Sequence, residues 1–436
     1  MKTGKPDVEP YSEASLAPHI RRIAEFLGKD YQKMYREPGG EIPHPFLTPG
    51  SAQYCDVLWD WDSWLTDVAL RQIVRRQGDP AEGLKLAVYE KGCIQNWLEY
   101  SKRASCVGWV PIWVNRSGNT MPQDFYAQNM HKPCLVQHAA FIVRENGGDV
   151  EWLREGLMFL QYFVNNYRNH HRHACGLYFW QNDSAIGVDN DPCTFGRPPR
   201  SSGSIYLNCM MYKELLAMVY LLNLAGLDEV ARQYQADADA LREAIRTHCW
   251  DERDGFYYSV DLNLTHPELQ RWTAHSGQPR DWSCLIQRIG VWSGFLAMWA
   301  GVATPEQAKR MVREHYQDPR TFNAPFGVRT LSRMEKMYNL RASGNPSSWL
   351  GPIWGISNYM VFRGLVQYGF TDEARELAGK TITLFGSDLE KCGAMHEYYQ
   401  PENGAPLLNI GFQNWNYLVL NMIAWLRGEP VVEEWG

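Results

Sequence analysis

A regular alternation of short and long connections between helical segments constrains the fold of this chain most strongly. Apolar residues recur at helical spacing in twelve segments of the 436-residue sequence, which favours helices over strands. Short connections such as GDPAE, NGGD and AGL follow the even-numbered segments, and long connections follow the odd-numbered ones. The segments are residues 14–37, 62–77, 83–102, 134–146, 151–172, 205–224, 228–249, 284–299, 304–315, 348–367, 371–387 and 410–426.

The polarity of the segments alternates with the same parity. Residues 228–249 carry eight Asp, Glu, Lys or Arg side chains, whereas residues 205–224 carry only Lys213 and Glu214. A helix with a charged face lies at the surface, and one that is apolar nearly all round is buried. Six hairpins, each with one inner and one outer helix, predict an all-α fold, the (α/α)6 barrel. Because successive helices are antiparallel, the six long connections would emerge at one end.

The domain organisation expected from this pattern is simple. The sequence shows no long β-pattern and no linker, so we expect residues 1–436 to form a single domain. Short flexible tails are expected at about residues 1–12 and 428–436.

Composition excludes several classes of partner. The net charge of -6 gives no basic footprint for nucleic acid or an anionic membrane. The N-terminus has no apolar run typical of a secretory signal, and nowhere do eighteen apolar residues follow one another. The ten cysteines are scattered without a CxxC pair, and we interpret them as reduced core residues rather than disulfides or a zinc site. A cytoplasmic protein is therefore expected.

Two loops contain the candidate catalytic residues. Residues 181–200 combine Asp189 with further Asp, Arg, Pro and Gly residues, a mixture that only a loop tolerates. Residues 393–404 contain Glu397. Both loops follow odd-numbered segments, so they would lie at the same end of the barrel and across its axis. A carboxylic acid and a carboxylate on opposite sides of a sugar, roughly 6.5–9.5 Å apart, are what inverting glycosidic cleavage needs.

The pKa of the proposed acid depends on its neighbours. Asp183 and Asp191 would disfavour ionisation of Asp189, whereas Arg197 and Arg200 would oppose this if they point inward. Aromatic residues are abundant, with 18 Trp, 23 Tyr and 16 Phe, and many of the tryptophans lie in the long connections. Aromatic faces suit the C–H faces of a sugar ring, although core packing is the simpler explanation.

Four motifs in the chain resemble those of glycoside hydrolase family 63, especially its compact bacterial mannosylglycerate and glucosylglycerate hydrolases, and more distantly trehalases. The acid motif of that family, Gly-Met-Asp-Asn-Ser-Pro, is similar to residues 187–192, GVDNDP. A Trp-Asp-Ser element matches residues 61–63, and WLGPIWG at residues 349–355 matches a third element. The Glu-x-Tyr element with the family's base corresponds to residues 397–399. The motifs occur in the same order as in that family, between residues 54 and 420.

The resemblance implies an inverting α-glycosidase with Asp189 as general acid and Glu397 as general base. An α-glucoside or an α-mannoside of disaccharide or glycosylglycerate size fits equally well, without a cofactor or metal ion. The family's Ser-Gln-Pro-Pro element is altered here to residues 131–134, HKPC, so that a cation stands where glutamine is usual and suggests an anionic substrate. The residues implied to line the sugar site are Trp59, Trp61, Asp62, Lys132, Trp349, Trp354 and Gln413.

Other interpretations of the same residues stay open at this point. A sugar epimerase or isomerase on the same barrel would use His131, His275 or His396 as acid and base. A carbohydrate-binding protein without catalysis is a third possibility. Trp349 and Trp354 would also fit barrel packing, and Asp62 would fit an N-cap. The three aspartates of residues 181–200 would fit a Ca²⁺ site, although the pattern of an EF-hand is absent.

Overall fold

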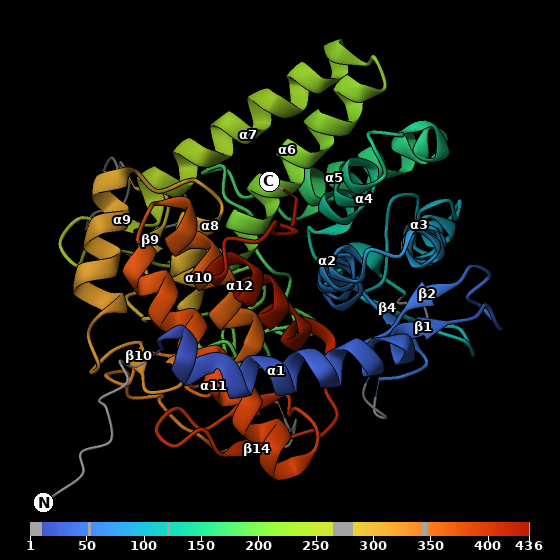
Figure 1. The fold of residues 1–436 in the computed structure, drawn as a ribbon. Coiled ribbons are helices and arrows are strands. Elements are labelled where there is room, and N and C mark those ends of the chain that lie inside the picture. Colours follow the sequence, from blue (N-terminus) through green and yellow to red (C-terminus); the bar gives the residue numbers. More distant parts are fainter. Residues whose placement is uncertain (1–10, 51–53, 120–122, 265–281, 342–346, 436) are drawn as a thin grey trace, which may run out of the picture.

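Twelve α-helices form the framework of the computed structural model, which describes residues 11–50, 54–119, 123–264, 282–341 and 347–435 (Figure 1). Each helix falls within or close to one of the predicted helical segments, so the predicted order of elements is confirmed. The helices are α1 (Glu13–Asp30), α2 (Asp60–Gln77), α3 (Pro80–Ser101), α4 (Leu135–Glu145), α5 (Leu157–His170), α6 (Ile205–Leu224), α7 (Asp228–His248), α8 (Leu296–Trp299), α9 (Pro305–Met311), α10 (Gly355–Gln367), α11 (Thr371–Cys392) and α12 (Val419–Leu426).

The even-numbered helices contact one another in a closed sequence. Helix α2 packs on α4, α4 on α6, α6 on α8, α8 on α10, α10 on α12, and α12 on α2. Four odd-numbered helices lie against them: α3 packs on α2 and α4, α5 and α7 on α6, and α11 on α10. Figure 1 shows α1 lying beside α11, and the two helices are in contact.

Burial follows the predicted alternation of polarity. Fifteen of the 20 residues of α6 are buried, including the two charged side chains. In α7 the buried positions, Ala231, Tyr234, Ala238, Leu241 and Ile245, repeat every three or four residues and form one face. Helix α6 is also the one described helix that is long and apolar enough to cross a membrane. Of its most apolar 18-residue stretch, 83% is buried inside the protein, as in a core helix.

Every described strand lies in a connection from an odd-numbered to an even-numbered helix, and none exceeds three residues. Antiparallel pairs join β3 to β4, β12 to β13, and β13 to β14, and the remaining strands also pair in antiparallel fashion. The strands are β1 (Tyr35–Arg36), β2 (Phe46–Leu47), β3 (Val57–Trp59), β4 (Trp113–Asn115), β5 (Ser202–Gly203), β6 (Trp250–Asp251), β7 (Phe256–Tyr257), β8 (Val260–Asp261), β9 (Leu285–Ile286), β10 (Asn323–Ala324), β11 (Gly327–Val328), β12 (Ile353–Trp354), β13 (Tyr398–Tyr399) and β14 (Pro406–Leu408).

Three inner helices, α8, α10 and α12, begin later than the sequence predicted. In the segment 410–426, α12 begins only after a 3-10 turn at Asn414–Leu418. The segment 284–299 opens with strand β9, and α8 begins only after a 3-10 turn at Trp292–Phe295. The segment 348–367 opens with a loop, because Gly351 has a φ of 137° and is followed by a proline, so α10 begins at Gly355.

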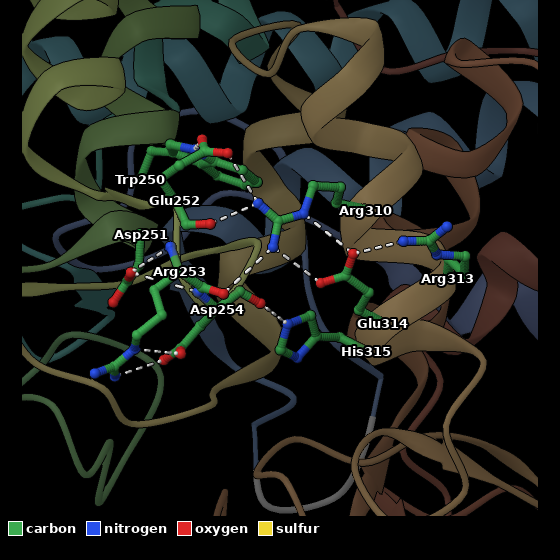
Figure 2. Close-up of polar contacts among 9 residues, drawn as sticks. All are labelled: Trp250, Asp251, Glu252, Arg253, Asp254, Arg310, Arg313, Glu314 and His315. Carbon is green, nitrogen blue, oxygen red and sulfur yellow. Dashed lines mark hydrogen bonds and ion pairs between the residues drawn. The ribbon is translucent and has the colours of Figure 1, made fainter.

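An ion-pair network fixes the β6–β7 turn against the end of α9 (Figure 2). Arg310 pairs with Glu314 one turn later and with Glu252 of the turn, each at 3.1 Å. The Nε2 atom of His315 lies 2.7 Å from the carbonyl oxygen of Asp254. A single exposed ion pair contributes little to stability, but a network with several charges defines geometry. This network therefore holds the β6–β7 turn of the α7–α8 connection in place.

Part of the segment predicted as a flexible tail, residues 428–436, is anchored to the inner helices. Glu434 is buried, and its carboxylate accepts hydrogen bonds from Trp299 Nε1 at 2.9 Å and Tyr359 Oη at 2.6 Å. Arg363 Nε forms an ion pair with the same carboxylate at 3.0 Å. A charge that is satisfied in this way is a buried anchor rather than part of a tail.

The segment 430–435 contacts all six inner helices. Besides the anchor on α8 and α10, the side chain of Gln72 on α2 bonds to both Pro430 and Val432, and Asn421 on α12 donates to the Val432 carbonyl. Further contacts reach Arg144 on α4 and Lys213 on α6, whose ammonium lies 5.5 Å from the Trp435 ring. The predicted N-terminal tail lies mostly outside the described residues.

Candidate active site

The long connections enclose a cavity of about 180 Å³ that brings the two candidate catalytic carboxylates together. Asp189 comes from the α5–α6 connection and Glu397 from the α11–α12 connection. The cavity is lined by Tyr54, Trp59, Trp61, Asp62, Ile112, Lys132, Ala185, Gly187, Asp189, Ser347, Trp354, Glu397, Asn409, Phe412 and Trp415.

Close packing beneath Gly187 positions the loop that contains Asp189. Gly187 has a φ of 83°, and a Cβ atom at this position would overlap the side chain of Lys132 and lie 2.9 Å from Trp61. Only glycine allows this conformation and this approach together. Directly after Asp189, Asn190 also has a positive φ, and its Oδ1 atom accepts a hydrogen bond from the Trp349 amide at 2.8 Å. The loop is thus fixed on both sides of Asp189.

The two arginines of residues 181–200 bond to partners other than Asp189. Arg197 pairs with Asp261 at 2.5 Å, and Arg200 donates to the side chain of Gln181 at 2.7 Å. Asp183 is exposed, whereas Asp191 is buried and accepts a hydrogen bond from the Cys193 amide at 3.0 Å. Asp189 alone of the three aspartates lines the cavity. The arrangement gives no support to the Ca²⁺ site considered for them.

A small sheet positions Glu397. Its amide donates to the Leu408 carbonyl at 3.1 Å, and the next residue, Tyr398 in β13, pairs with Trp354 in β12. Asn409 Nδ2 donates a hydrogen bond to the Glu397 carboxylate. Burial raises the pKa of Glu397 to about 7; the neighbouring Asp189 charge adds to this, and hydrogen bonds from Asn409 and Tyr54 oppose it. Glu397 therefore changes its protonation state near neutral pH.

Asp388, in the last turn of α11, supports the loop that contains Glu397. Its Oδ2 atom accepts hydrogen bonds from the His396 amide at 3.0 Å and from Tyr399 Oη at 2.8 Å. The Nδ1 atom of His396 lies 2.9 Å from the same oxygen. One carboxylate oxygen thereby holds residues on both sides of Glu397.

A stack of aromatic rings forms one wall of the site. The rings of Trp349 and Trp354 are 4.1 Å apart at 10°, and Trp354 stacks on Tyr398 at 4.8 Å and 15°. Trp354 lines the cavity, whereas Trp349 is buried behind it. Trp59 and Trp61 line the cavity as well. Three of the four tryptophans expected at the sugar site therefore line the cavity, and Trp349 does not.

The charge of Lys132 is already paired. Its ammonium lies 2.7 Å and 2.8 Å from the two carboxylate oxygens of Asp60, and both side chains are buried. Asp62, next to this pair, accepts a hydrogen bond from Asn414. Burial raises the pKa of Asp62 to about 8, and the charge of Asp60 adds to this effect. The interpretation of Lys132 as the sign of an anionic substrate is therefore not supported by its contacts.

The sequence placed Gln413 in the site, but the structure does not. Its side chain is buried without lining the cavity, and the neighbouring Asn414 is the residue that contacts Asp62. Sequence reasoning missed the cavity residues Tyr54, Asn409, Phe412 and Trp415. Asn409 gave one usable signal, since an Asn beside a turn often adopts positive φ, and here φ is 50°.

The two described histidines of the epimerase alternative, His131 and His396, do not line the cavity. His131 packs against Trp97, with ring centroids 4.8 Å apart, and burial lowers its pKa to about 4. His396 contacts Asp388 instead. His275 lies outside the described residues. The alternative is therefore not supported.

Comparison with known proteins agrees with this geometry. Residues 56–416 match the family described as the mannosylglycerate hydrolase MGH1-like glycoside hydrolase domain. The chain belongs to this family. The predicted resemblance to glycoside hydrolase family 63 is thereby confirmed.

Individual relatives of this MGH1-like chain include hydrolases of two kinds. Mannosylglycerate hydrolase MGH1 of Selaginella moellendorffii is 26% identical over 411 residues, which are 84% of this chain and 80% of that protein. A cytosolic neutral trehalase of Kluyveromyces lactis is 27% identical over 191 residues, which are 42% of this chain. That match spans only 22% of the trehalase.

Solved structures show the same fold. The mannosylglycerate hydrolase of glycoside hydrolase family 63 from Thermus thermophilus, in complex with glucose, has a TM-score of 0.64 and 17% identity, and the match covers 92% of this chain and 98% of that chain. Neutral trehalase Nth1 from Saccharomyces cerevisiae has a TM-score of 0.60 and 15% identity, with 86% and 73% covered. The MGH1-like chain is therefore a mostly helical protein of the fold that these hydrolases share.

Proposed function

We propose that this MGH1-like protein is an inverting α-glycosidase that hydrolyses a small α-glucoside or α-mannoside, with Asp189 as general acid and Glu397 as general base. The observation that carries the proposal is the convergence of these two carboxylates, from two connections far apart in the sequence, on one cavity with aromatic walls. The Thermus thermophilus hydrolase is described in complex with glucose, which supports a sugar as ligand here.

The proposed chemistry follows from the surroundings of each carboxylate. Asp189 would donate its proton to the leaving oxygen, and Arg197 and Arg200 are both engaged with other partners. Glu397 would accept a proton from water on the other side of the sugar ring. The pKa of Glu397, raised to about 7, makes it a stronger base than an ordinary glutamate once it is ionised. Asn409 and Tyr54 would orient its carboxylate.

The size and walls of the cavity favour a small substrate. Its volume of about 180 Å³ lies below the range of about 300–1,000 Å³ typical of pockets for drug-sized ligands. Trp59, Trp61 and Trp354 line it, as expected for a site that binds a sugar ring. Lys132 is neutralised by Asp60, so a neutral glycoside is as compatible with the described lining as a glycosylglycerate.

The wider setting is part of the same proposal. We infer that the closed ring of even-numbered helices with odd-numbered helices outside it is an (α/α)6 barrel forming a single domain. We place the protein in the cytoplasm, because buried cysteines such as Cys93, Cys134 and Cys209 are free thiols and one relative is named a cytosolic trehalase.

The assignment of acid and base is tested with two substrates of different leaving groups. An alkyl α-glycoside needs protonation of the leaving oxygen, whereas an α-glycosyl fluoride does not. The Asp189→Asn variant should lose hydrolysis of the alkyl glycoside and keep much of its activity on the fluoride, and Glu397→Gln should lose both. Full activity of Asp189→Asn on the alkyl glycoside would overturn the proposal.

A further inference from the structure

A second cluster of chemically competent side chains lies behind the loop that contains Glu397. A carboxylate oxygen of Asp388, the thiol sulfur of Cys392 and a ring nitrogen of His396 lie within 4.8 Å of one another. Asp388 and Cys392 are one turn apart at the end of α11. The chain then reverses through Gly393, whose φ of 74° returns His396 to the same side.

The two oxygens of Asp388 differ in their partners. Oδ2 is bonded to the His396 amide, to Tyr399 Oη and to His396 Nδ1. Among the described residues, Oδ1 is buried and has no nitrogen or oxygen atom as a hydrogen-bond partner. A buried carboxylate oxygen without a partner costs free energy, and a cation would satisfy it. Cys392, in contrast, is exposed, so solvent reaches the cluster from that side.

The donor set selects the metal. A thiolate, an imidazole nitrogen and a carboxylate oxygen match zinc, whereas Ca²⁺ and Mg²⁺ prefer oxygen ligands alone. Three protein ligands with a fourth position open to solvent are typical of accessible zinc sites. We propose that Asp388, Cys392 and His396 form a binding site for Zn²⁺ that regulates the adjacent catalytic loop. On binding, the Cys392 thiol would release its proton to solvent and ligate the ion as thiolate.

Occupancy would change the support of Glu397. The ion would be coordinated by the Asp388 carboxylate and the His396 ring. In the structure these two side chains contact each other, and that contact helps to position residues 396–399. His396 directly precedes Glu397, so a displacement of the former moves the latter. We therefore expect Zn²⁺ to inhibit hydrolysis. This second part depends on the proposed function, whereas binding itself does not.

The alternative is a purely structural role, in which Asp388 only fastens the loop through its three contacts. Cys392 separates the two possibilities. Its exposed thiol bonds to the Asp388 carboxylate, but that bond is not one of the three contacts that hold residues 396–399. The matched control is Cys55→Ala, which removes a thiol that lies outside the cluster. Both variants alter a single side chain, and neither belongs to the catalytic machinery proposed above.

The test is calorimetric titration of ZnCl₂ into the full-length protein after treatment with a chelator, together with the absorbance of the Co²⁺-loaded protein. One equivalent of Zn²⁺ and a thiolate-to-Co²⁺ band are expected for the wild type and for Cys55→Ala. Cys392→Ala should lose the band and weaken binding by more than the about 10- to 100-fold that loss of an outer partner costs. Absence of binding to the wild type, or equal binding to Cys392→Ala, would overturn the site.

Activity measurements then decide the regulatory part. Zn²⁺ should inhibit the wild type and Cys55→Ala reversibly, with recovery on chelation, and should spare Cys392→Ala, whose activity without zinc should equal that of the wild type. Binding through Cys392 without inhibition would overturn the regulation and leave the site standing. If no glycoside is hydrolysed by any variant, the proposed function fails while the calorimetric result still decides the zinc site.

Discussion

The side-chain amide of Asn409 donates a hydrogen bond to the carboxylate of Glu397. Asn409 holds this position with a backbone φ of 50°, a conformation that asparagine tolerates better than most residues. Because the hydrogen bond stabilises the ionised carboxylate, it keeps the pKa of Glu397 lower than burial alone would set it.

Replacing Asn409 by Ala should therefore make Glu397 harder to ionise. The acidic limb of the kcat/KM profile should move to higher pH, and kcat/KM at pH 6 should fall by about 10- to 100-fold, the range expected for losing a hydrogen bond to a charged group. The control is Asn403→Ala, an exposed asparagine of the same connection. If the acidic limb of the profile stays at the same pH in Asn409→Ala, Asn409 does not lower the pKa of Glu397.

Replacing Glu397 by Gln should stabilise the protein at alkaline pH. The raised pKa means that ionisation of Glu397 costs free energy in the folded state, and this cost appears as the pH rises from about 4.5 to about 7. At pH 8 we expect Glu397→Gln to be more stable than the wild type by up to about 3 kcal/mol, and at pH 4 the two should agree. Urea unfolding at both pH values measures the difference. Equal stability at pH 8 would mean that the carboxylate is well solvated.

Gly187→Ala should disrupt the loop that contains Asp189, since the new methyl group overlaps Lys132 and approaches Trp61. Overpacking and the positive φ together predict a loss of about 1–3 kcal/mol and a large loss of kcat. Gly196→Ala is the control in the same loop: its φ is 70°, but nothing lies within 4 Å of the added Cβ. That variant should lose about 1 kcal/mol from backbone strain and keep its activity. Similar kinetics for the two variants would contradict the packing argument.

Glu434→Gln should destabilise the chain by about 3 kcal/mol at pH 7, because it removes the buried carboxylate that pairs with Arg363 and leaves only the half-exposed Glu433 as counter-charge. Burial raises the pKa of Glu434, but the ion pair with Arg363 and the hydrogen bonds from Tyr359 and Trp299 outweigh it, so the pKa is lowered overall. The stabilisation is thus present at neutral pH and disappears as the pH falls below the ordinary range of glutamate.

Thermal unfolding as a function of pH measures this effect. The gap between the wild type and Glu434→Gln should narrow on acidification, while Glu433→Gln should cost under about 1 kcal/mol at any pH, because Glu433 is half exposed. A pH-independent gap would locate the effect in packing instead of the ion pair.

The sequence predicted the parts of the fold that depend on periodic patterns. Alternating polarity, as between α6 and α7, identified inner and outer helices, and the parity of the connections placed Asp189 and Glu397 at one end. The residues at which individual helices begin were harder to predict. Apolar residues at 285–286 look helical, but they pair in a sheet through tertiary contacts that no local pattern records.

Polar contacts between distant segments could not be predicted either. Glu434 looked like a tail residue because its partners, Trp299, Tyr359 and Arg363, lie 71 to 135 positions away. Lys132 suggested an anionic ligand because its pairing with Asp60, 72 positions away, is invisible in the sequence. Charge that is neutralised inside the protein gives the same sequence signal as charge that faces a ligand.

The central claim is tested most directly by following hydrolysis of an α-glucoside and an α-mannoside by proton NMR, with the Asp189→Asn variant alongside. If Asp189 and Glu397 act as acid and water-activating base, the β-anomer of the free sugar appears first and the variant releases none. If the α-anomer appears first, Glu397 attacks the sugar instead of activating water, and the inverting mechanism is wrong.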